Sequence, residues 1–217
     1  MNYLKIDKED ICNGDGLRVV LWLSGCSHKC KGCQNPQTWD ANSGIPFDES
    51  TREELFRELD KDYISGLTLT GGDPLFESNL DGVLDLVTEV NKRYNQNVFQ
   101  NAEMLLDRGR GSLPSDLSVN DKLFANESRL SSPKKSIWLY SGYTWEQLFD
   151  DDEFDIKGGI CENQTRRAIV LSSDVFVDGQ YIESQRDISL SYRGSSNQRL
   201  IDTQQSLEKG EIVLWQT

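Results

Sequence analysis

The sequence has little histidine, few basic residues and no long apolar run. One histidine occurs in 217 residues, and 23 Lys and Arg stand against 36 Asp and Glu, for a formal net charge of −13. This surplus of negative charge disfavours nucleic acids and anionic membranes as partners, because phosphate binding requires Lys and Arg. No apolar run approaches the roughly 20 residues that cross a bilayer, and residues 1–10 contain no apolar run typical of a signal peptide. We therefore expect a cytoplasmic protein that binds neither nucleic acid nor membrane.

Cysteine is also scarce, yet three of the five cysteines lie within eight residues. Cys26, Cys30 and Cys33 have the spacing C-x3-C-x2-C. An odd total and a cluster too tight to bridge comfortably argue against disulfides and for a reducing compartment. The other two, Cys12 and Cys161, are distant in the sequence, and we expect them to be free thiols without a role.

Three clustered thiolates indicate a metal centre with one ligand missing. Iron–sulfur clusters and structural zinc ions normally have four protein ligands. Three thiolates on a [4Fe-4S] cluster would leave one iron open to a small molecule. A zinc-binding interaction module is the alternative from a different class, with His28 as fourth ligand. However, only one residue separates His28 from each neighbouring cysteine, which is tighter than usual for zinc ligands, so we expect its side chain to point away.

The order of apolar segments predicts an α/β fold. We expect strands, helices and crossover connections of a parallel sheet, because strand-like and helix-like segments alternate. The predicted strands cover residues 18–23, 66–70, 137–140, 170–171 and 175–177, and the predicted helices cover residues 50–59, 80–94 and 144–149. The first helix would begin with two capping boxes, Ser50 with Glu53 and Thr51 with Glu54.

Two polar stretches interrupt this alternation. Residues 95–136 and 150–167 are rich in polar and charged residues. Such segments bury too little apolar surface to form a core of their own. We therefore predict a single domain, residues 1–217, with surface insertions at about 95–136 and 150–167.

Two loops follow predicted strand ends, where sites of parallel α/β proteins gather. One is the cysteine loop after Leu23, and the other is Gly71-Gly72-Asp73-Pro74 after Thr70. Glycines let backbone groups approach a ligand closely, and a proline keeps the preceding residue extended. Alone, this second motif is more often a plain turn. Beside three thiolates it becomes a candidate binder of a zwitterion's amino group, through backbone carbonyls or the Asp73 carboxylate.

Together these motifs resemble the radical S-adenosylmethionine enzymes, and more closely the family that activates anaerobic ribonucleoside-triphosphate reductase. The three-cysteine loop is typical of the superfamily, and the stretches TLTGGDPL and RGSSNQR narrow it to the family. The matching stretches occur in the family's order, at residues 13–18, 25–40, 67–75, 141–148, 177–181 and 193–199. The two polar insertions lie between them.

The resemblance implies a mechanism and a set of site residues. Cys26, Cys30 and Cys33 would bind three irons of a [4Fe-4S] cluster, and S-adenosylmethionine would bind the fourth. Its methionine end would lie at Gly71, Gly72 and Asp73, and its adenosyl part near Gly32, Cys33 and Gln34. Reductive cleavage would yield a 5′-deoxyadenosyl radical, which takes a hydrogen atom from a glycine of the reductase's large catalytic subunit.

The resemblance further implies an incomplete TIM-like (βα) barrel and a flavodoxin- or ferredoxin-like electron donor. Gln34 departs from the family, which usually has tyrosine there. Arg193 and Arg199 could contact the ligand's carboxylate or the partner subunit, with surface salt bridges as the alternative. An activase of another glycyl-radical enzyme, such as pyruvate formate-lyase, is the alternative within the same enzyme class.

Overall fold

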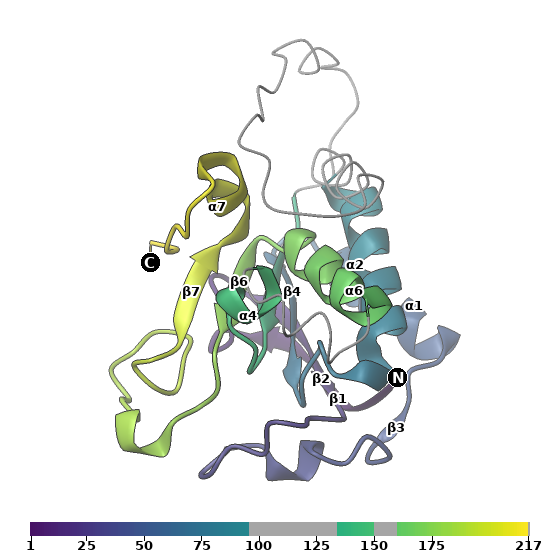
Figure 1. The fold of residues 1–217 in the computed structure, drawn as a ribbon. Coiled ribbons are helices and arrows are strands. Elements are labelled where there is room, and N and C mark those ends of the chain that lie inside the picture. The colour runs from purple at the N-terminus through teal and green to yellow at the C-terminus, as the bar shows by residue number, and fades with distance from the viewer. Residues whose placement is uncertain (96–133, 150–159, 217) are drawn as a thin grey trace.

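The computed structural model describes residues 1–95, 134–149 and 160–216, which form a mixed α/β fold around one sheet (Figure 1). The sheet has seven strands in the order β3-β1-β2-β4-β5-β6-β7. The strands are β1 (Asn2–Asp10), β2 (Arg18–Leu23), β3 (Ile45–Pro46), β4 (Gly66–Gly71), β5 (Ser136–Tyr140), β6 (Val175–Asp178) and β7 (Arg199–Asp202). The helices are α1 (Glu49–Leu59), α2 (Leu80–Tyr94), α4 (Trp145–Phe149), α6 (Ile160–Leu171) and α7 (Thr203–Lys209), with 3-10 turns η1 (Pro36–Thr38), η2 (Glu77–Asn79) and η3 (Glu183–Gln185).

The centre of the sheet is parallel and its flanks are antiparallel. Strands β2, β4, β5 and β6 pair in parallel, whereas β1 and β7 run antiparallel to their neighbours. Consecutive parallel strands are joined by segments that contain helices, as parallel pairing requires. The predicted α/β class is therefore confirmed. Because the four central strands run the same way, their carboxyl ends meet at one edge of the sheet.

The core lies between one face of the sheet and helices α1, α2 and α6, which gather on the same side of it (Figure 1). Alternate residues of the central strands point to this face, and they are fully buried. The cluster includes Val19, Leu21, Leu23, Leu67, Leu69, Ile137 and Leu139 from the strands and Leu55, Leu59, Val83, Val87 and Ile169 from the helices. Its burial supplies most of the driving force for folding.

A buried arginine joins three strands on the opposite face. Arg18 has no exposed surface, and its guanidinium donates to Thr68 Oγ1 at 2.7 Å and to the carbonyls of Leu67 and Ser136, each at 2.7 Å. Burial lowers the pKa of Arg18 to about 10. Full hydrogen bonding of this kind is what makes a buried cation tolerable.

Residues 150–167 differ in part from the prediction of a surface insertion. Residues 150–159 lie outside the described residues, but residues 160–167 instead belong to α6, where Asn163 and Arg166 are buried. The strand predicted at residues 170–171 is wrong, because these residues end the same helix. Of the other predicted insertion, residues 96–133 also lie outside the described part, and β5 begins at Ser136.

Helix α1 begins one residue earlier than predicted, with a different cap. Asp48 is the N-cap and accepts a hydrogen bond from the Thr51 amide at 2.9 Å. Ser50 and Thr51 therefore lie in the first turn, and the predicted capping boxes are wrong. An aspartate satisfies the free amides of a helix start as well as serine or threonine does.

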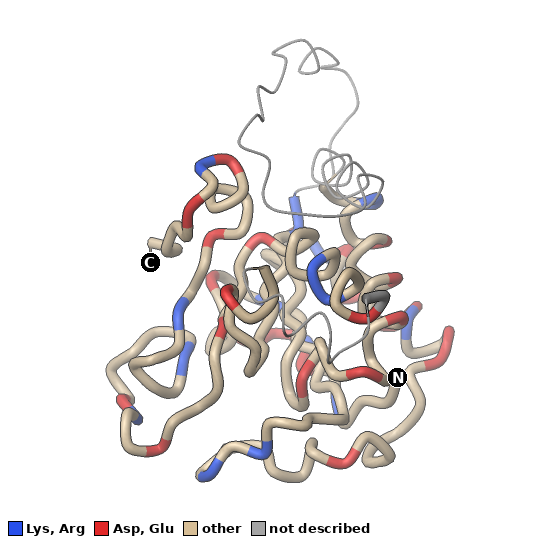
Figure 2. The backbone as a smooth tube through the Cα atoms, in the orientation of Figure 1, with Lys and Arg blue, Asp and Glu red and all other residues tan. Residues whose placement is uncertain are grey.

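Acidic and basic residues are interspersed along the described chain (Figure 2), so the negative net charge is not confined to one segment. Among the described helices, none has the length and apolar character needed to span a membrane.

Candidate metal centre

The cysteine loop, residues 24–43, leaves the carboxyl end of β2 and folds back on itself. The Gly25 amide donates to the Thr38 carbonyl at 2.7 Å, and the Cys26 amide donates to the Trp39 carbonyl at 3.1 Å. Between these anchors the backbone is left-handed at Lys29 (φ +45°) and Gly32 (φ +76°). Left-handed backbone of this kind is found in turns, so the chain turns between the cysteines.

The Gly-Gly-Asp-Pro turn, residues 71–74, packs directly against this loop. The Asp73 amide donates to the Gly25 carbonyl at 2.7 Å, and the Gly72 amide donates to the Leu23 carbonyl at 2.8 Å. A Cβ atom at Gly72 would lie 2.4 Å from the Gly25 carbonyl oxygen, which is closer than any side chain can approach. The two predicted loops are therefore in contact, and glycine at position 72 permits it.

The three cysteines are half-buried, and backbone amides face their sulfur atoms. The Asn35 amide donates to Cys33 Sγ at 3.3 Å. Burial, together with the Asp73 carboxylate, raises the pKa of the Cys26 thiol to about 11, against the effect of nearby backbone amides. Burial also raises the pKa of Cys30, opposed by the Tyr181 amide. A bound metal would displace these protons, since only thiolates are good ligands.

The donor set of the cysteine loop consists of three thiols, and thiolates are ligands of both iron–sulfur clusters and zinc. A cubane distributes its thiolates over different irons. Cys30 lies close enough to Cys26, and Cys33 close enough to Cys30, to contribute to the raised pKa of Cys26 and of Cys30. Soft donors at this spacing, with amides facing the sulfurs, suit three corners of a cluster.

Asp73 is buried, and protein groups already surround its carboxylate. Only 2% of its surface is exposed. It accepts hydrogen bonds from the Leu75 amide at 2.8 Å, the Ser141 hydroxyl at 2.9 Å and the Gly142 amide at 3.0 Å. His28 Nε2 lies 2.8 Å from Asp73 Oδ2, although this contact is not a hydrogen bond.

The backbone carbonyls of the turn differ in the hydrogen bonds that they accept. Thr38 Oγ1 donates to the Gly71 carbonyl at 2.9 Å, and the Asp73 carbonyl accepts from the Phe76 amide and from Asn79 Nδ2. Among the hydrogen bonds of the described residues, none reaches the Gly72 carbonyl. Among the described residues, the Gly72 carbonyl is thus an acceptor without a donor, close to Gly25 of the cysteine loop.

Other predicted residues have more modest surroundings. Gln34 and Gly32 are exposed, and Gly32 lies beside Glu183, because a Cβ atom there would be 3.0 Å from the Glu183 carboxyl carbon. Cys12 is exposed in the connection from β1 to β2, at the opposite end of β2 from the cysteine loop. The backbone at Cys161 lies in α6.

Arg199 follows the salt-bridge alternative. Its guanidinium pairs with Glu146, at 2.8 and 2.7 Å, and with the buried Asp178. This pairing lowers the pKa of Glu146 to about 2 and raises that of Arg199. Arg193 differs, because its buried Nε has no hydrogen-bond partner among the described residues. Arg199 therefore braces β7 against α4.

The sequence analysis matched residues 141–148 and 177–181 to the family, but it did not assign the segments after β5 and β6 to the site. Ser141, Gly142 and Tyr143 follow β5, and Gln180, Tyr181 and Glu183 follow β6. They contact the cysteine loop or the turn through Asp73, His28, Cys30 and Lys31. The signal that could have found them is their position, because both segments leave the carboxyl ends of parallel strands.

Comparison with known proteins gives consistent matches over most of the chain. The family model described as "4Fe-4S single cluster domain" matches residues 12–106 and 119–201. A protein of enterobacteria phage T4 is 36% identical over 200 residues, covering 92% of this chain and 93% of its own length. A protein of Haemophilus influenzae is 30% identical, covering 91% and 96%, and one of Vibrio cholerae is 32% identical, with the same coverage. All three are named anaerobic ribonucleoside-triphosphate reductase-activating protein.

Proposed function

The chain belongs to the family of anaerobic ribonucleoside-triphosphate reductase-activating proteins and carries a 4Fe-4S single cluster domain, and from this premise we propose that it activates such a reductase through S-adenosylmethionine. The activation consists of generating a glycyl radical on the large catalytic subunit. The protein is then a radical S-adenosylmethionine oxidoreductase, a glycyl-radical activating enzyme.

One observation carries the proposal: the cysteine loop and the Gly-Gly-Asp-Pro turn are in backbone contact. The Asp73 amide is 2.7 Å from the Gly25 carbonyl, the residue before Cys26. A ligand that binds a metal at the cysteines and donates an amino group to the turn therefore spans adjacent backbone segments. S-adenosylmethionine has an amino group and a carboxylate that can bind a metal, both on its methionine end.

The cysteines would hold the cluster by three irons. When bound, a [4Fe-4S] cluster supplies one electron and an open coordination position for reductive cleavage of the sulfonium C–S bond, giving methionine and a 5′-deoxyadenosyl radical that abstracts hydrogen from a partner glycine. The protein supplies orientation and shields the reaction from solvent. Cys26, Cys30 and Cys33 would hold the cluster in the loop that contacts the turn through Gly25.

The turn would orient the methionine end. The Gly72 carbonyl, which has no donor among the described residues, can accept from the amino group, while Gly71 and Asp73 hold the turn against the cysteine loop. The Asp73 carboxylate supports the site at a distance, because its oxygens already bind Leu75, Ser141 and Gly142. Gly32, Cys33 and Gln34 would lie near the adenosyl part.

We also propose that the sheet is the incomplete (βα) barrel of radical S-adenosylmethionine enzymes. Four parallel strands in sequential order, with helices on one face, support this assignment. In the described residues the outermost strands of the order, β3 and β7, do not pair with each other. An unclosed barrel would admit the glycine-bearing segment of the large subunit.

The reaction needs one electron from outside the protein, and we propose a flavodoxin- or ferredoxin-like donor. We place the protein in the cytoplasm, since four cysteines of the described residues are free thiols, as expected in a reducing compartment. Neither nucleic acid nor membrane is a proposed partner.

The decisive experiment is anaerobic activation of a candidate large subunit. Protein reconstituted with iron and sulfide is expected to be brown, with about four irons per chain for one cubane. With reductant, S-adenosylmethionine and the large subunit, it should form 5′-deoxyadenosine and the EPR doublet of a glycyl radical. Cys30→Ala is expected to abolish both products, and Cys12→Ala, at the far end of β2, to retain them.

Other results would contradict the proposal. A colourless protein with one tightly bound zinc would favour the interaction module. Radical formation on pyruvate formate-lyase, with none on the ribonucleotide reductase subunit, would change the partner while keeping the chemistry.

A further inference from the structure

His28, the single histidine of the chain, lies between Cys26 and Cys30, and most of its side chain is covered by other parts of the protein. Its side chain is 9% exposed, whereas Ser27 and Lys29 on either side are exposed. The ring packs edge to face on Tyr143, with 4.7 Å between ring centroids. It also covers Gly142, where a Cβ atom would lie 2.4 Å from His28 Cδ2. The ring therefore occupies a space that the segment after β5 leaves for it.

Both ring nitrogens face protein groups from other loops. Nε2 lies 2.8 Å from Asp73 Oδ2, and Nδ1 lies 3.2 Å from Gln180 Nε2. These two contacts join the cysteine loop to the turn after β4 and to the segment after β6.

We propose that His28 is a positioning residue, which fixes the stretch from Cys26 to Cys30 on the Gly-Gly-Asp-Pro turn. It thereby sets where these two cysteines lie relative to the Gly72 carbonyl. This inference rests on the proposed function. It extends that function by naming a residue that touches neither cluster nor ligand.

The need for such an anchor follows from the other contacts of the loop. Its start is held to η1 and the residue after it, at Gly25 and Cys26. Between Cys26 and Cys33, Lys29 and Lys31 extend to solvent, and Lys31 has only a 3.6 Å contact with the exposed Glu183. The Tyr181 amide faces Cys30, and Ser27 contacts Tyr143, but the His28 side chain contacts the segments after β4, β5 and β6 together.

The test compares His28→Ala with Lys31→Ala, a matched change in the same loop at a side chain that is 92% exposed. Full-length proteins are loaded with iron and sulfide, and the dissociation constant of S-adenosylmethionine is measured by equilibrium dialysis. Removing a group that orients metal ligands typically costs 10- to 100-fold, so we expect about that weakening in His28→Ala and no change in Lys31→Ala. The EPR spectrum of the reduced cluster is expected to respond less to added S-adenosylmethionine in His28→Ala alone.

A second measurement needs no cluster. In the metal-free proteins, alkylation of Cys26 and Cys30 is followed peptide by peptide by mass spectrometry. Loss of the anchor is expected to speed their alkylation about 5- to 30-fold, with Cys12 unchanged as internal reference. Gln180→Ala, which keeps the imidazole and removes its Nδ1 partner, is expected to show a smaller change in the same direction.

The outcomes separate the two proposals. If His28→Ala equals Lys31→Ala in ligand affinity, EPR response and alkylation rate, the positioning role is overturned. If His28→Ala cannot be loaded with iron, two other measurements test the positioning role: the alkylation rates of metal-free His28→Ala and the affinity of loaded Gln180→Ala for S-adenosylmethionine. Wild-type values in both measurements would overturn the positioning role. If loaded wild-type protein fails to bind S-adenosylmethionine, the proposed function fails, while the alkylation rates still test the anchor.

Discussion

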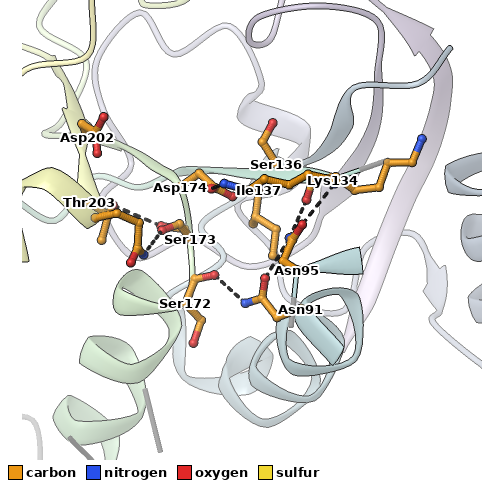
Figure 3. A network of polar contacts seen from close by, with 12 residues as sticks. Asn91, Asn95, Lys134, Ser136, Ile137, Ser172, Ser173, Asp174, Asp202 and Thr203 are labelled. Carbon is orange, nitrogen blue, oxygen red and sulfur yellow. Dashed lines mark hydrogen bonds and ion pairs between the residues drawn. The ribbon is translucent and has the colours of Figure 1, made fainter. Parts of the chain in front are cut away.

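The two ends of the parallel strands are both built from buried polar groups, but the groups are used differently. At the amino ends, side chains at the C-terminal end of α2, including its C-cap Asn95, close a network with the starts of β5 and β6 (Figure 3). Asn95 Nδ2 donates to the Lys135 carbonyl at 2.7 Å, and Asn95 Oδ1 accepts from the Lys135 amide at 3.1 Å. Asp174 accepts from the Ile137 amide at 2.8 Å and from Lys134 Nζ at 2.6 Å. These groups satisfy one another, which indicates a stabilising role.

At the carboxyl ends, polar groups remain for something else to bind. The thiols of the cysteine loop are half-buried, and the Gly72 carbonyl has no donor among the described residues, whereas the supporting Asp73 carboxylate is enclosed by protein. The difference teaches that burial of a polar group does not by itself mark function. Function is indicated where buried residues hold in place other polar groups that have no protein partner among the described residues.

Gly72→Ala tests the carboxyl ends of the strands and is expected to have the largest effect, a loss of ligand affinity. The new Cβ would meet the Gly25 carbonyl at 2.4 Å, and backbone on both sides cannot move away cheaply. Overpacking of this kind costs about 1–3 kcal/mol. We expect the clash to push the turn away from the cysteine loop. We expect about 10- to 100-fold weaker binding of S-adenosylmethionine to the loaded protein, measured by equilibrium dialysis.

The matched control is Gly82→Ala in α2, where the nearest atoms belong to the flexible Met1 side chain. Alanine is favoured over glycine inside a helix by about 1 kcal/mol, so this variant should be at least as stable and bind normally. Equal ligand affinity in the two variants would contradict a contact-dependent site.

Asp174→Ala tests the amino end and is expected to affect stability alone. It leaves the Ile137 amide without its acceptor at a residue that is 0% exposed. An unsatisfied buried amide costs about 1–3 kcal/mol, measurable as a lower urea midpoint of unfolding. Ligand affinity of the folded protein should not change.

Asp174→Asn keeps an oxygen for the amide and is the control, with a smaller loss. A change in ligand affinity in Asp174→Ala would show that the two ends of the sheet are coupled.

Glu146→Gln is expected to have the smallest effect, visible through pH. Arg199 lowers the pKa of Glu146 from its usual 4.5 to about 2, so the pair stabilises the folded state above pH 4.5 and this contribution is lost as pH falls toward 2. Because the Glu146 side chain is 47% exposed, solvent screening limits the effect to about 1 kcal/mol or less.

The measurement is the difference in unfolding free energy between wild type and Glu146→Gln at pH 7 and at pH 3, which should shrink on acidification. Glu77→Gln, at an exposed residue, is the control and should show no such trend. A difference that grows at low pH would contradict the assigned pairing.

Several elements were predictable because their own residues determine them. The apolar runs of β2 and β4 and the helical spacing in α2 gave bounds within one residue of those observed. The C-terminal part of the fold was harder to predict from the sequence. Strand β7 has four residues, and α6 buries Asn163 and Arg166, polar residues that look exposed until Arg166 Nε reaches the Leu75 carbonyl at 3.0 Å.

The sequence by itself determined the chemistry of the site, because three thiols in one short loop and a glycine-rich strand end are local patterns that no fold can create. Only the tertiary structure decided how those patterns meet. It enclosed the Asp73 carboxylate, left the Gly72 carbonyl open and turned His28 inward, since each outcome depends on side chains from loops more than 40 residues away. Local residue types set which bonds are possible, and packing between distant segments selects the ones that form.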